Sequence, residues 1–263
     1  MDNDRQVVPA PPLFYRLLES RAFYETGAFI ASSPVLRLAG RGDRHPVLVL
    51  PGFTATDRST EPLRWFLRGQ GYWTHGWLLG RNLGPTTRTL DGLGARLVEL
   101  HARHGRPVSV IGWSLGGIYA RMLARSHPEL VRQVITLGSP FRMQQGDHSN
   151  AEALWSALAP GFPEDLTNLF DNQTPLPVPA TAIYSKTDGV VAWYTCIETV
   201  GPRRESIEVR GSHMGLGVNP AVLWAVTNRL AQREGTWQPF RAPLAMRQMF
   251  PRPESYRTGS KAA

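Results

Sequence analysis

Residues 110–117 read VIGWSLGG, and this stretch decides the fold of the chain. An apolar run leads directly to Ser114, with Gly112 before it and Gly116 after it. A strand that turns at once into a helix strains the backbone of the residue at the turn and holds its side chain clear of the sheet edge. We therefore expect glycine at both flanking positions because a Cβ atom there would collide with neighbouring backbone.

The segments on either side alternate between strand and helix patterns. Apolar runs that predict strands cover residues 45–53, 72–79, 107–112, 131–140, 178–185 and 206–210. Helical patterns lie between most of them, and the first is expected to begin at Ser59 or Thr60 as its N-cap, with Pro62 in its first turn. Strands that are apolar throughout predict an α/β fold, with a mostly parallel central sheet and helices on both faces.

Three regions are expected along the chain. Residues 1–44 form an N-terminal helical extension whose helix stops near Ser32-Ser33-Pro34. Its apolar pattern favours docking on the protein surface, with a peripheral contact with a membrane as the alternative. Residues 45–232 form the main domain, with a helical cap inserted at about 141–177, and residues 233–263 form an extended, proline-containing tail.

Composition narrows the classes of partner. The 29 Lys and Arg residues against 21 Asp and Glu give a net charge of +8, but the arginines are scattered among acidic residues, so we expect a solvated surface and no nucleic-acid partner. Cys196 is the only cysteine, which leaves no internal disulfide, and no Cys/His spacing predicts a metal site. The start of the chain resembles no signal peptide and no run could span a bilayer, so we expect a cytoplasmic protein.

The turn at Ser114 also predicts donors for a negative charge. The helix that begins after it directs the backbone N–H of Leu115 and its positive dipole end toward the serine. A second N–H is expected from Phe53, because Gly52 lets the loop after the first strand approach closely. The alternative is that Pro51-Gly52 is only a turn that ends the strand.

A serine hydroxyl needs a base and an orienting carboxylate, which in this architecture follow the serine in the order acid, then histidine. His213 lies on a glycine-flanked loop after the last predicted strand, whereas the other six histidines lie before the motif, on helices or in the cap. Asp188 follows the strand at 178–185 and is the expected acid. Asp171 and Glu198 are weaker substitutes, and a plain Asp-Gly turn is the alternative reading of Asp188.

These residues resemble the α/β-hydrolase fold family, and within it the bacterial lipases and esterases. The resemblance covers about residues 45–232 and rests on LVLPGF (48–53), GWSLGG (112–117), TLGSPF (136–141), TDGVV (187–191) and GSHMGLG (211–217). It implies Ser114 as nucleophile, Asp188 as acid, His213 as base, and main-chain donors at Phe53 and Leu115. Pro51-Gly52 departs from the His-Gly that the family often has there, and secreted members commonly carry a signal peptide.

The predicted function is a cofactor-free serine hydrolase of carboxylic esters. Apolar residues in the cap, Trp155 and Phe170, together with Met214, are expected to bind the acyl group, which favours lipid-like or medium-chain esters; alternatively, the cap residues only pack the insert onto the body. An acyltransferase or thioesterase would use the same triad. A non-catalytic binding protein on this fold is the remaining alternative, and the oligomeric state is not predicted.

Overall fold

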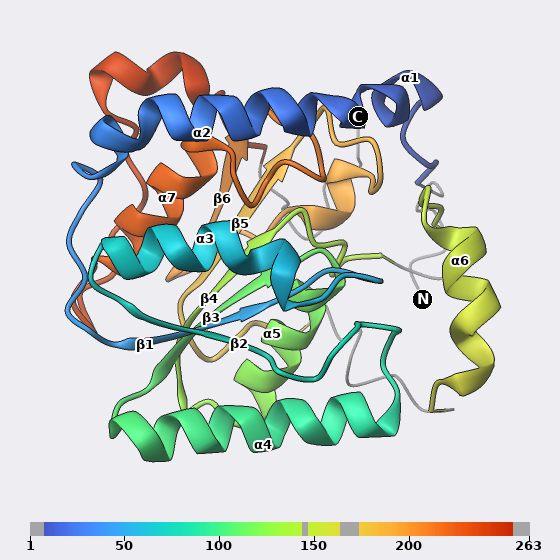
Figure 1. The fold of residues 1–263 in the computed structure, drawn as a ribbon, viewed down its shortest axis with the longest axis horizontal. Helices are drawn as coiled ribbons and strands as arrows, with labels where there is room; N and C mark the ends of the chain where they lie inside the picture. The colour runs from blue at the N-terminus through green and yellow to red at the C-terminus, as the bar shows by residue number, and fades with distance from the viewer. Residues whose placement is uncertain (1–7, 144–146, 164–173, 255–263) are drawn as a thin grey trace.

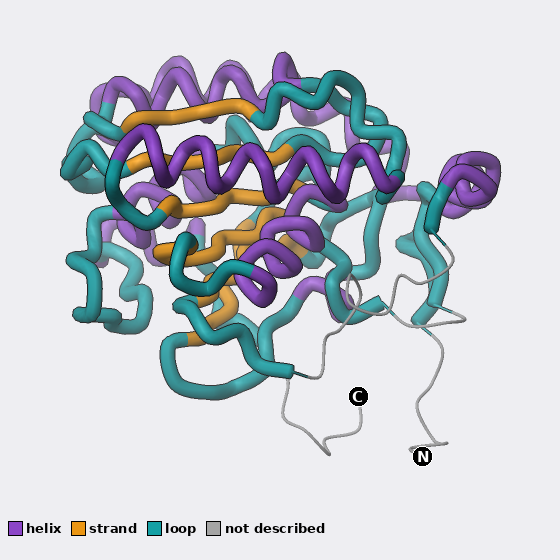
Figure 2. The backbone as a smooth tube through the Cα atoms, turned by 90° about the horizontal axis from the view of Figure 1, so that it is seen from below, coloured by secondary structure: helices purple, strands orange, loops and turns teal. Residues whose placement is uncertain are grey.

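A single parallel sheet organises the molecule. The computed structural model describes residues 8–143, 147–163 and 174–254. Six strands pair in the order β2-β1-β3-β4-β5-β6, and every pairing is parallel. The strands are β1 (Pro46–Leu50), β2 (Trp73–Gly76), β3 (Val108–Trp113), β4 (Val131–Leu137), β5 (Ala180–Ser185) and β6 (Arg204–Val209). The predicted α/β fold is confirmed, and Figure 2 shows the strands side by side in one twisted layer.

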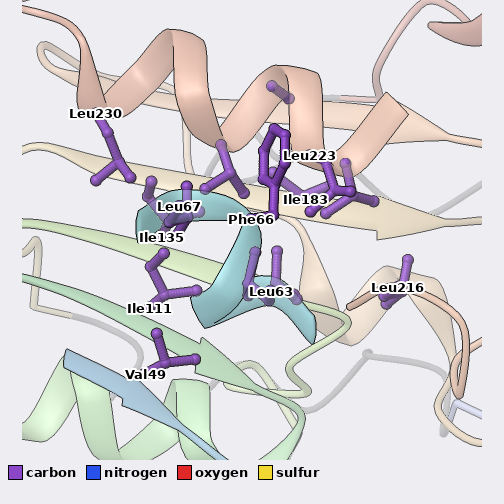
Figure 3. Close-up of a cluster of buried hydrophobic side chains, with 14 of the residues drawn as sticks. Val49, Leu63, Phe66, Leu67, Ile111, Ile135, Ile183, Leu216, Leu223 and Leu230 are labelled. Atoms are coloured by element: carbon purple, nitrogen blue, oxygen red, sulfur yellow. The ribbon is translucent and has the colours of Figure 1, made fainter. Parts of the chain in front are cut away.

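Helices cover both faces of the sheet, as Figure 1 shows. α3 (Asp57–Gly69) and α7 (Pro220–Leu230) lie on one face, and α4 (Thr87–His104) and α5 (Leu115–Ser126) on the other. Alternate residues of each central strand point to opposite faces, so Val49 joins one buried cluster and Leu48 the other. Figure 3 shows part of the first cluster, where side chains of β1, β3, β4 and β5 meet those of α3 and α7. These two cores fix the strand ends at which the loops of the candidate site begin.

The start of α3 differs from the prediction. Thr56 is its N-cap, with a side-chain oxygen that accepts from the N–H of Arg58, whereas Ser59 and Thr60 already lie inside the helix. Both of those hydroxyls donate to carbonyl groups one turn back, at Thr56 and Asp57. The prediction was wrong because several hydroxyl residues precede the helix and only tertiary packing selects one of them.

The N-terminal extension comprises α1 (Leu13–Leu17), a 3-10 turn η1 (Leu18–Arg21) and α2 (Ala22–Leu36). Its helix does not stop at Ser32-Ser33-Pro34, because Pro34 lies within the last turn of α2. Phe29 and Leu36 are buried in the first core cluster, and α2 contacts α7. The extension therefore docks on the body through α2, while eight of its described large apolar side chains remain exposed: Leu13, Phe14, Leu17, Phe23, Tyr24, Ile30, Val35 and Leu38.

The expected cap is described only in part. Within residues 141–177 the structure has a short helix, α6 (Glu152–Leu158), and a 3-10 turn, η2 (Ala159–Gly161). Phe170 and Asp171 lie outside the described residues. In Figure 1, α6 lies at the same end of the molecule as α1, and Asn150 joins this region to the extension by donating to the carbonyl of Pro11 at 3.2 Å.

The tail is not extended throughout. It contains a 3-10 helix, η4 (Leu244–Met249), and Phe240 and Phe250 pack on each other and against the first core cluster. The expectation followed from its prolines, which disfavour long helices but not a short 3-10 segment. In the described part of the chain, no helix has the length and apolarity to cross a bilayer.

A third, smaller buried cluster lies under the loop after β5. Tyr184, Val191, Cys196 and Ile197 form it, and Cys196 belongs to the 3-10 turn η3 (Trp193–Cys196). Burial, reinforced by the negative charge of Asp188, raises the pKa of the Cys196 thiol well above its ordinary value. The thiol is therefore protonated and enclosed at neutral pH.

Candidate active site

Ser114 lies at a strained turn between β3 and α5. Its φ of 52° and ψ of −123° place a non-glycine residue at positive φ, a conformation that costs on the order of 1–3 kcal/mol. Hydrogen bonds hold the turn, because the N–H of Ser114 donates to the Leu137 carbonyl at 2.8 Å and its own carbonyl accepts from Gly117 at 2.9 Å. The surrounding sheet thus fixes the strained residue, as the sequence predicted.

The two bracketing glycines have the steric role that was expected. A Cβ atom at Gly112 would collide with the backbone of Gly116 and Gly117. A Cβ atom at Gly116 would lie 2.5 Å from the carbonyl oxygen of Leu50, the last residue of β1. The first turn of α5 therefore packs directly against two strand ends, and the prediction of steric need is confirmed.

The loop after β1 lies against Ser114, so the predicted donors come from two elements: Phe53 from this loop and Leu115 from the start of α5. A Cβ atom at Gly52 would be 3.3 Å from the Cβ of Ser114, which shows how closely the loop approaches. The backbone N–H groups of Phe53 and Leu115 donate to no other described residue. These are the two groups predicted to stabilise an oxyanion.

Asn82 holds this loop in place and was not found from the sequence. Its side-chain amide donates to the Pro51 carbonyl at 2.9 Å, and its own carbonyl accepts from the N–H of Thr54 at 2.6 Å. It is fully buried, and its side-chain oxygen also accepts from Tyr119. A lone asparagine 29 positions after Phe53 gives no sequence signal, because its partners are backbone groups of a distant loop.

His213 and Asp188 form a buried pair. Nδ1 of His213 lies 2.6 Å from Oδ2 of Asp188, and the two residues are 4% and 3% exposed. The other oxygen of Asp188 accepts from the N–H groups of Val190 and Val191 at 2.8 and 2.9 Å, which fixes the carboxylate. The loop after β5 thus presents an oriented acid to the loop after β6, as the order acid, then histidine, required.

Two further contacts bring this pair to the serine turn. The indole Nε1 of Trp113, the residue before Ser114, donates to the His213 carbonyl at 3.1 Å. Gly138, which follows β4 with a φ of 53°, leaves room for the pair, because a Cβ there would be 3.1 Å from His213 Nδ1. The Ser114 hydroxyl itself forms no hydrogen bond with a described residue, and such bonds commonly tighten only when substrate binds.

The environment of His213 favours its protonated form. Burial, the largest effect, opposes protonation, but the charge and hydrogen bond of Asp188, assisted by the charge of Glu19, outweigh it and raise the pKa of His213 above 6.5. An imidazole in this setting accepts a proton readily and is stabilised once charged.

The other candidates are occupied elsewhere. Glu198 is buried in an ion pair with Arg121 at 2.5 Å, so it does not serve His213. Four histidines have partners remote from Ser114: His45 contacts Asp43 and Ser109, His75 contacts His104, and His148 contacts Glu152. Among the described residues, no group of three His, Cys, Asp or Glu side chains is arranged to hold a metal ion.

Of the expected acyl-binding residues, Trp155 contacts the donor loop. Its ring packs on Phe53 with centroids 5.5 Å apart, and on Phe162 at 4.8 Å. Met214 follows His213 and is 58% exposed. Phe170 is not among the described residues, so its place in the site stays a prediction.

Comparison with known proteins gives a family match and several likenesses of fold. A sequence model described as the alpha/beta hydrolase fold matches residues 46–182. The structure is similar to Aspergillus fumigatus lipase B, with 17% identity, a TM-score of 0.56, and coverage of 75% of this chain and 54% of the lipase. It is also similar to Bacillus licheniformis lipase BlEst2, with 15% identity, a TM-score of 0.52, and coverage of 74% of this chain and 94% of that lipase. A third similar structure is that of the pyrethroid hydrolase PytH, with 17% identity, a TM-score of 0.50, and coverage of 73% of this chain and 99% of PytH. This chain thus spans about half the length of the Aspergillus lipase. No curated protein matches the sequence.

Proposed function

The chain belongs to the α/β-hydrolase fold family, and on that premise we propose that it is a serine hydrolase of carboxylic esters. The observation that carries the proposal is the buried His213–Asp188 pair, tied through Trp113 to the strained turn that presents Ser114. A histidine with an oriented Nδ1 and a serine at such a turn are the parts that activate a hydroxyl nucleophile.

In the proposed reaction, Nε2 of His213 takes the hydroxyl proton as Ser114 Oγ bonds to the acyl carbon of the ester. The carbonyl π electrons move to oxygen, and His213 then gives the proton to the leaving alcohol as the ester C–O bond breaks. Water attacks the resulting acyl-serine with the same base and releases the carboxylic acid. Asp188 holds the imidazole and stabilises its charged form throughout.

The oxyanion of each tetrahedral intermediate is proposed to bind the N–H groups of Phe53 and Leu115. Within the described part of the chain neither N–H has an acceptor, and the N-terminus of α5 adds a favourable dipole at the same place. Loss of one such donor typically reduces kcat by about 10²–10³-fold.

The direct test uses a fluorophosphonate probe on the full-length protein. We expect one adduct, on Ser114, located by mass spectrometry of peptides. Ser114→Ala and His213→Ala should both abolish adduct formation and hydrolysis of p-nitrophenyl butyrate, while the exposed control substitutions Ser126→Ala and His148→Ala leave both unchanged. Absence of an adduct in folded wild-type protein, or near-normal hydrolysis by Ser114→Ala, would refute the proposed serine hydrolase. The remaining alternative would then be a non-catalytic binding protein.

The same assay separates ester hydrolysis from its relatives. An acyltransferase would form a new ester in preference to the free acid when an alcohol is added, and a thioesterase would cleave acyl thioesters faster than oxygen esters. We propose hydrolysis of oxygen esters as the main reaction, so free acid should dominate the products in both trials.

We further propose that the substrates are lipid-like or medium-chain acyl esters. The support is the apolar contact of Trp155 with Phe53 and Phe162, which lies beside the proposed oxyanion donor, and the exposed thioether of Met214 next to His213. Trp155→Ala should therefore lower kcat/KM more for octanoate than for acetate esters. Trp73→Ala, at the amino end of β2, is the control and should affect both equally; equal losses in Trp155→Ala would contradict the assignment.

A peripheral contact with lipid is proposed for the exposed apolar side chains of the N-terminal extension. Phe23 and Ile30 are 84% and 69% exposed, and the chain carries a net charge of +8. The wild type and the tail control Leu244→Ser should sediment with phosphatidylcholine–phosphatidylglycerol vesicles, whereas a Phe23→Ser, Ile30→Ser variant should stay in solution. Wild-type protein that does not sediment would contradict this contact.

A further inference from the structure

One carboxylate of the N-terminal extension binds both loops that carry the proposed acid and base. Oε1 of Glu19 accepts from the N–H of Gly189 at 2.8 Å and from that of His213 at 3.0 Å. Its Oε2 accepts from the N–H of Met214 at 2.8 Å. Glu19 therefore bridges the residue after Asp188 to the backbone of His213 itself, across more than 160 positions of sequence.

Two neighbouring side chains of the extension make further hydrogen bonds to the same two loops. Arg21 donates to the carbonyls of Thr187 and Gly211 at 2.5 and 3.0 Å, one on each loop. Glu25 accepts from the N–H and the hydroxyl of Ser212 at 2.8 and 3.1 Å. The extension thus makes charged hydrogen bonds to the residues on both sides of the Asp188–His213 pair.

The loops have glycine where the extension approaches them. A Cβ atom at Gly215 would collide with the Glu25 carboxylate, and one at Gly189 would collide with the backbone of Tyr15. The close fit is therefore built from both sides, because neither loop position has space for a side chain while the extension is docked.

Apolar packing does not explain this end of the extension. Neither α1 nor η1 buries a residue. A cavity of about 310 Å³ lies between the extension and the two loops, and its lining includes Arg21, Glu25, Thr187 and Gly211. The residues that α2 buries are Phe29, at the middle of the helix, and Leu36, at its far end. The extension is anchored there, and its first part reaches the loops through polar contacts.

We propose that Glu19 is a positioning residue, which holds the Asp188 and His213 loops in register so that the imidazole stays oriented toward Ser114. This inference rests on the proposed function. Three N–H groups share one carboxylate, so loss of that carboxylate frees both loops at once, and a displacement of about 1 Å at a reacting group can cost on the order of 10²-fold in rate.

The charge of Glu19 gives the proposal a second readout. The ionisable groups that face His213 or its loop are Asp188, Glu19, Glu25 and Arg21, with the protonated Cys196 beneath Asp188. The negative charge of Glu19 contributes to the raised pKa of His213. Removal of that charge should therefore lower this pKa and move the acidic limb of kcat/KM toward lower pH, which a purely structural role would not do.

The experiment compares full-length Glu19→Gln with wild type and with Glu61→Gln, an identical change at an exposed position of α3. Hydrolysis of p-nitrophenyl butyrate is followed from pH 5 to 9, with melting temperature as the check of folding. In Glu19→Gln the amide oxygen can still accept from Gly189 and His213, but the NH₂ group cannot accept from Met214. We therefore expect a loss of about 10-fold in kcat/KM, with the acidic limb at lower pH. Glu61→Gln should match wild type in both.

Glu19→Asp separates position from charge. It keeps the negative charge but is one methylene shorter, so it should lose rate while its acidic limb stays near that of wild type. If Glu19→Gln does not fold, Glu19→Asp alone tests the positioning role. Wild-type rates with an unmoved limb in Glu19→Gln, or wild-type rates in Glu19→Asp, would overturn the positioning role. Wild-type protein that neither hydrolyses the ester nor reacts with a fluorophosphonate would instead refute the proposed function, and the positioning role with it.

Discussion

Replacement of Asp188 with asparagine should disable the proposed base while leaving the fold almost intact. Oδ1 of Asp188 accepts from the N–H groups of Val190 and Val191, and only Oδ2 faces His213. An asparagine keeps its oxygen on those two donors, so its NH₂ group points at Nδ1 of the imidazole. The neutral histidine must then carry its proton on Nε2, the nitrogen that has to take the proton of Ser114.

The size of the effect follows from that exchange of tautomer. The equivalent change in serine proteases reduces kcat by about 10⁴-fold, which corresponds to about 5 kcal/mol of activation free energy. The free energy of unfolding should fall much less, by about 1–3 kcal/mol, because the charge-assisted hydrogen bond to the histidine is replaced by a weaker neutral one. The two amide hydrogen bonds to the side chain remain.

Glu198→Gln is the matched control, since it makes the same chemical change at the other buried carboxylate between β5 and β6. Glu198 is paired with Arg121, whose guanidinium also lies 3.9 Å over the ring of Phe141. Loss of the negative charge leaves a buried cation without compensation, which typically costs about 3–5 kcal/mol of stability. The folded fraction of this variant should nevertheless hydrolyse esters at the wild-type rate.

The two variants are therefore expected to show opposite patterns. Urea denaturation gives the free energy of unfolding of each, and kcat for p-nitrophenyl butyrate is measured under conditions where each is folded. Asp188→Asn should be stable and inactive, and Glu198→Gln less stable and active. If Asp188→Asn kept more than about a tenth of wild-type kcat, or if Glu198→Gln lost activity while folded, Asp188 would not be the acid.

Three other outcomes are expected. Because His213 must be neutral to accept a proton and its pKa is raised above 6.5, kcat/KM should fall as the pH drops through a value above 6.5; a limb below 6.5 would contradict this. Gly112→Ala should lose about 1–3 kcal/mol of stability by collision with Gly116, whereas Gly94→Ala, whose Cβ meets only a ring carbon at 3.8 Å, should be neutral or stabilising by up to about 1 kcal/mol in a thermal melt. Burial lowers the pKa of His45 to about 4, so the unfolded state binds the proton first, and urea titrations should show a loss of about 3 kcal/mol between pH 6.5 and 4 that His45→Gln lacks.

Local sequence patterns were sufficient for the sheet and for the serine turn. Strands such as β3 are uniformly apolar and are buried on both faces, so a simple run of residues predicts them. The turn at Ser114 was predictable because its glycines are required by backbone atoms only a few residues away and at one strand end. The order of Asp188 and His213 along the chain led to the pair that the structure brings together at 2.6 Å.

The features that were missed depend on contacts between distant segments. Asn82 and Glu19 act on backbone groups of loops remote in sequence, so no periodicity or spacing marks them. Pro34 suggested the end of a helix, yet a proline in the last turn removes only one hydrogen bond of α2, and the burial of Leu36 offsets it. Such choices are made by tertiary packing and are not encoded in a local pattern.

The single cysteine makes the movements of the acid-bearing loop measurable without any substitution. Cys196 packs with Val191 and Tyr184 beneath that loop, and its sulfur is shielded and protonated. A thiol-specific reagent can then react with Cys196 only while the cluster is locally open. The rate of modification in native buffer therefore measures how often this local opening occurs. A tightly bound inhibitor that restrains the loop should lower the rate at which Cys196 is modified. That rate therefore reports whether the inhibitor is bound, and it does not depend on turnover.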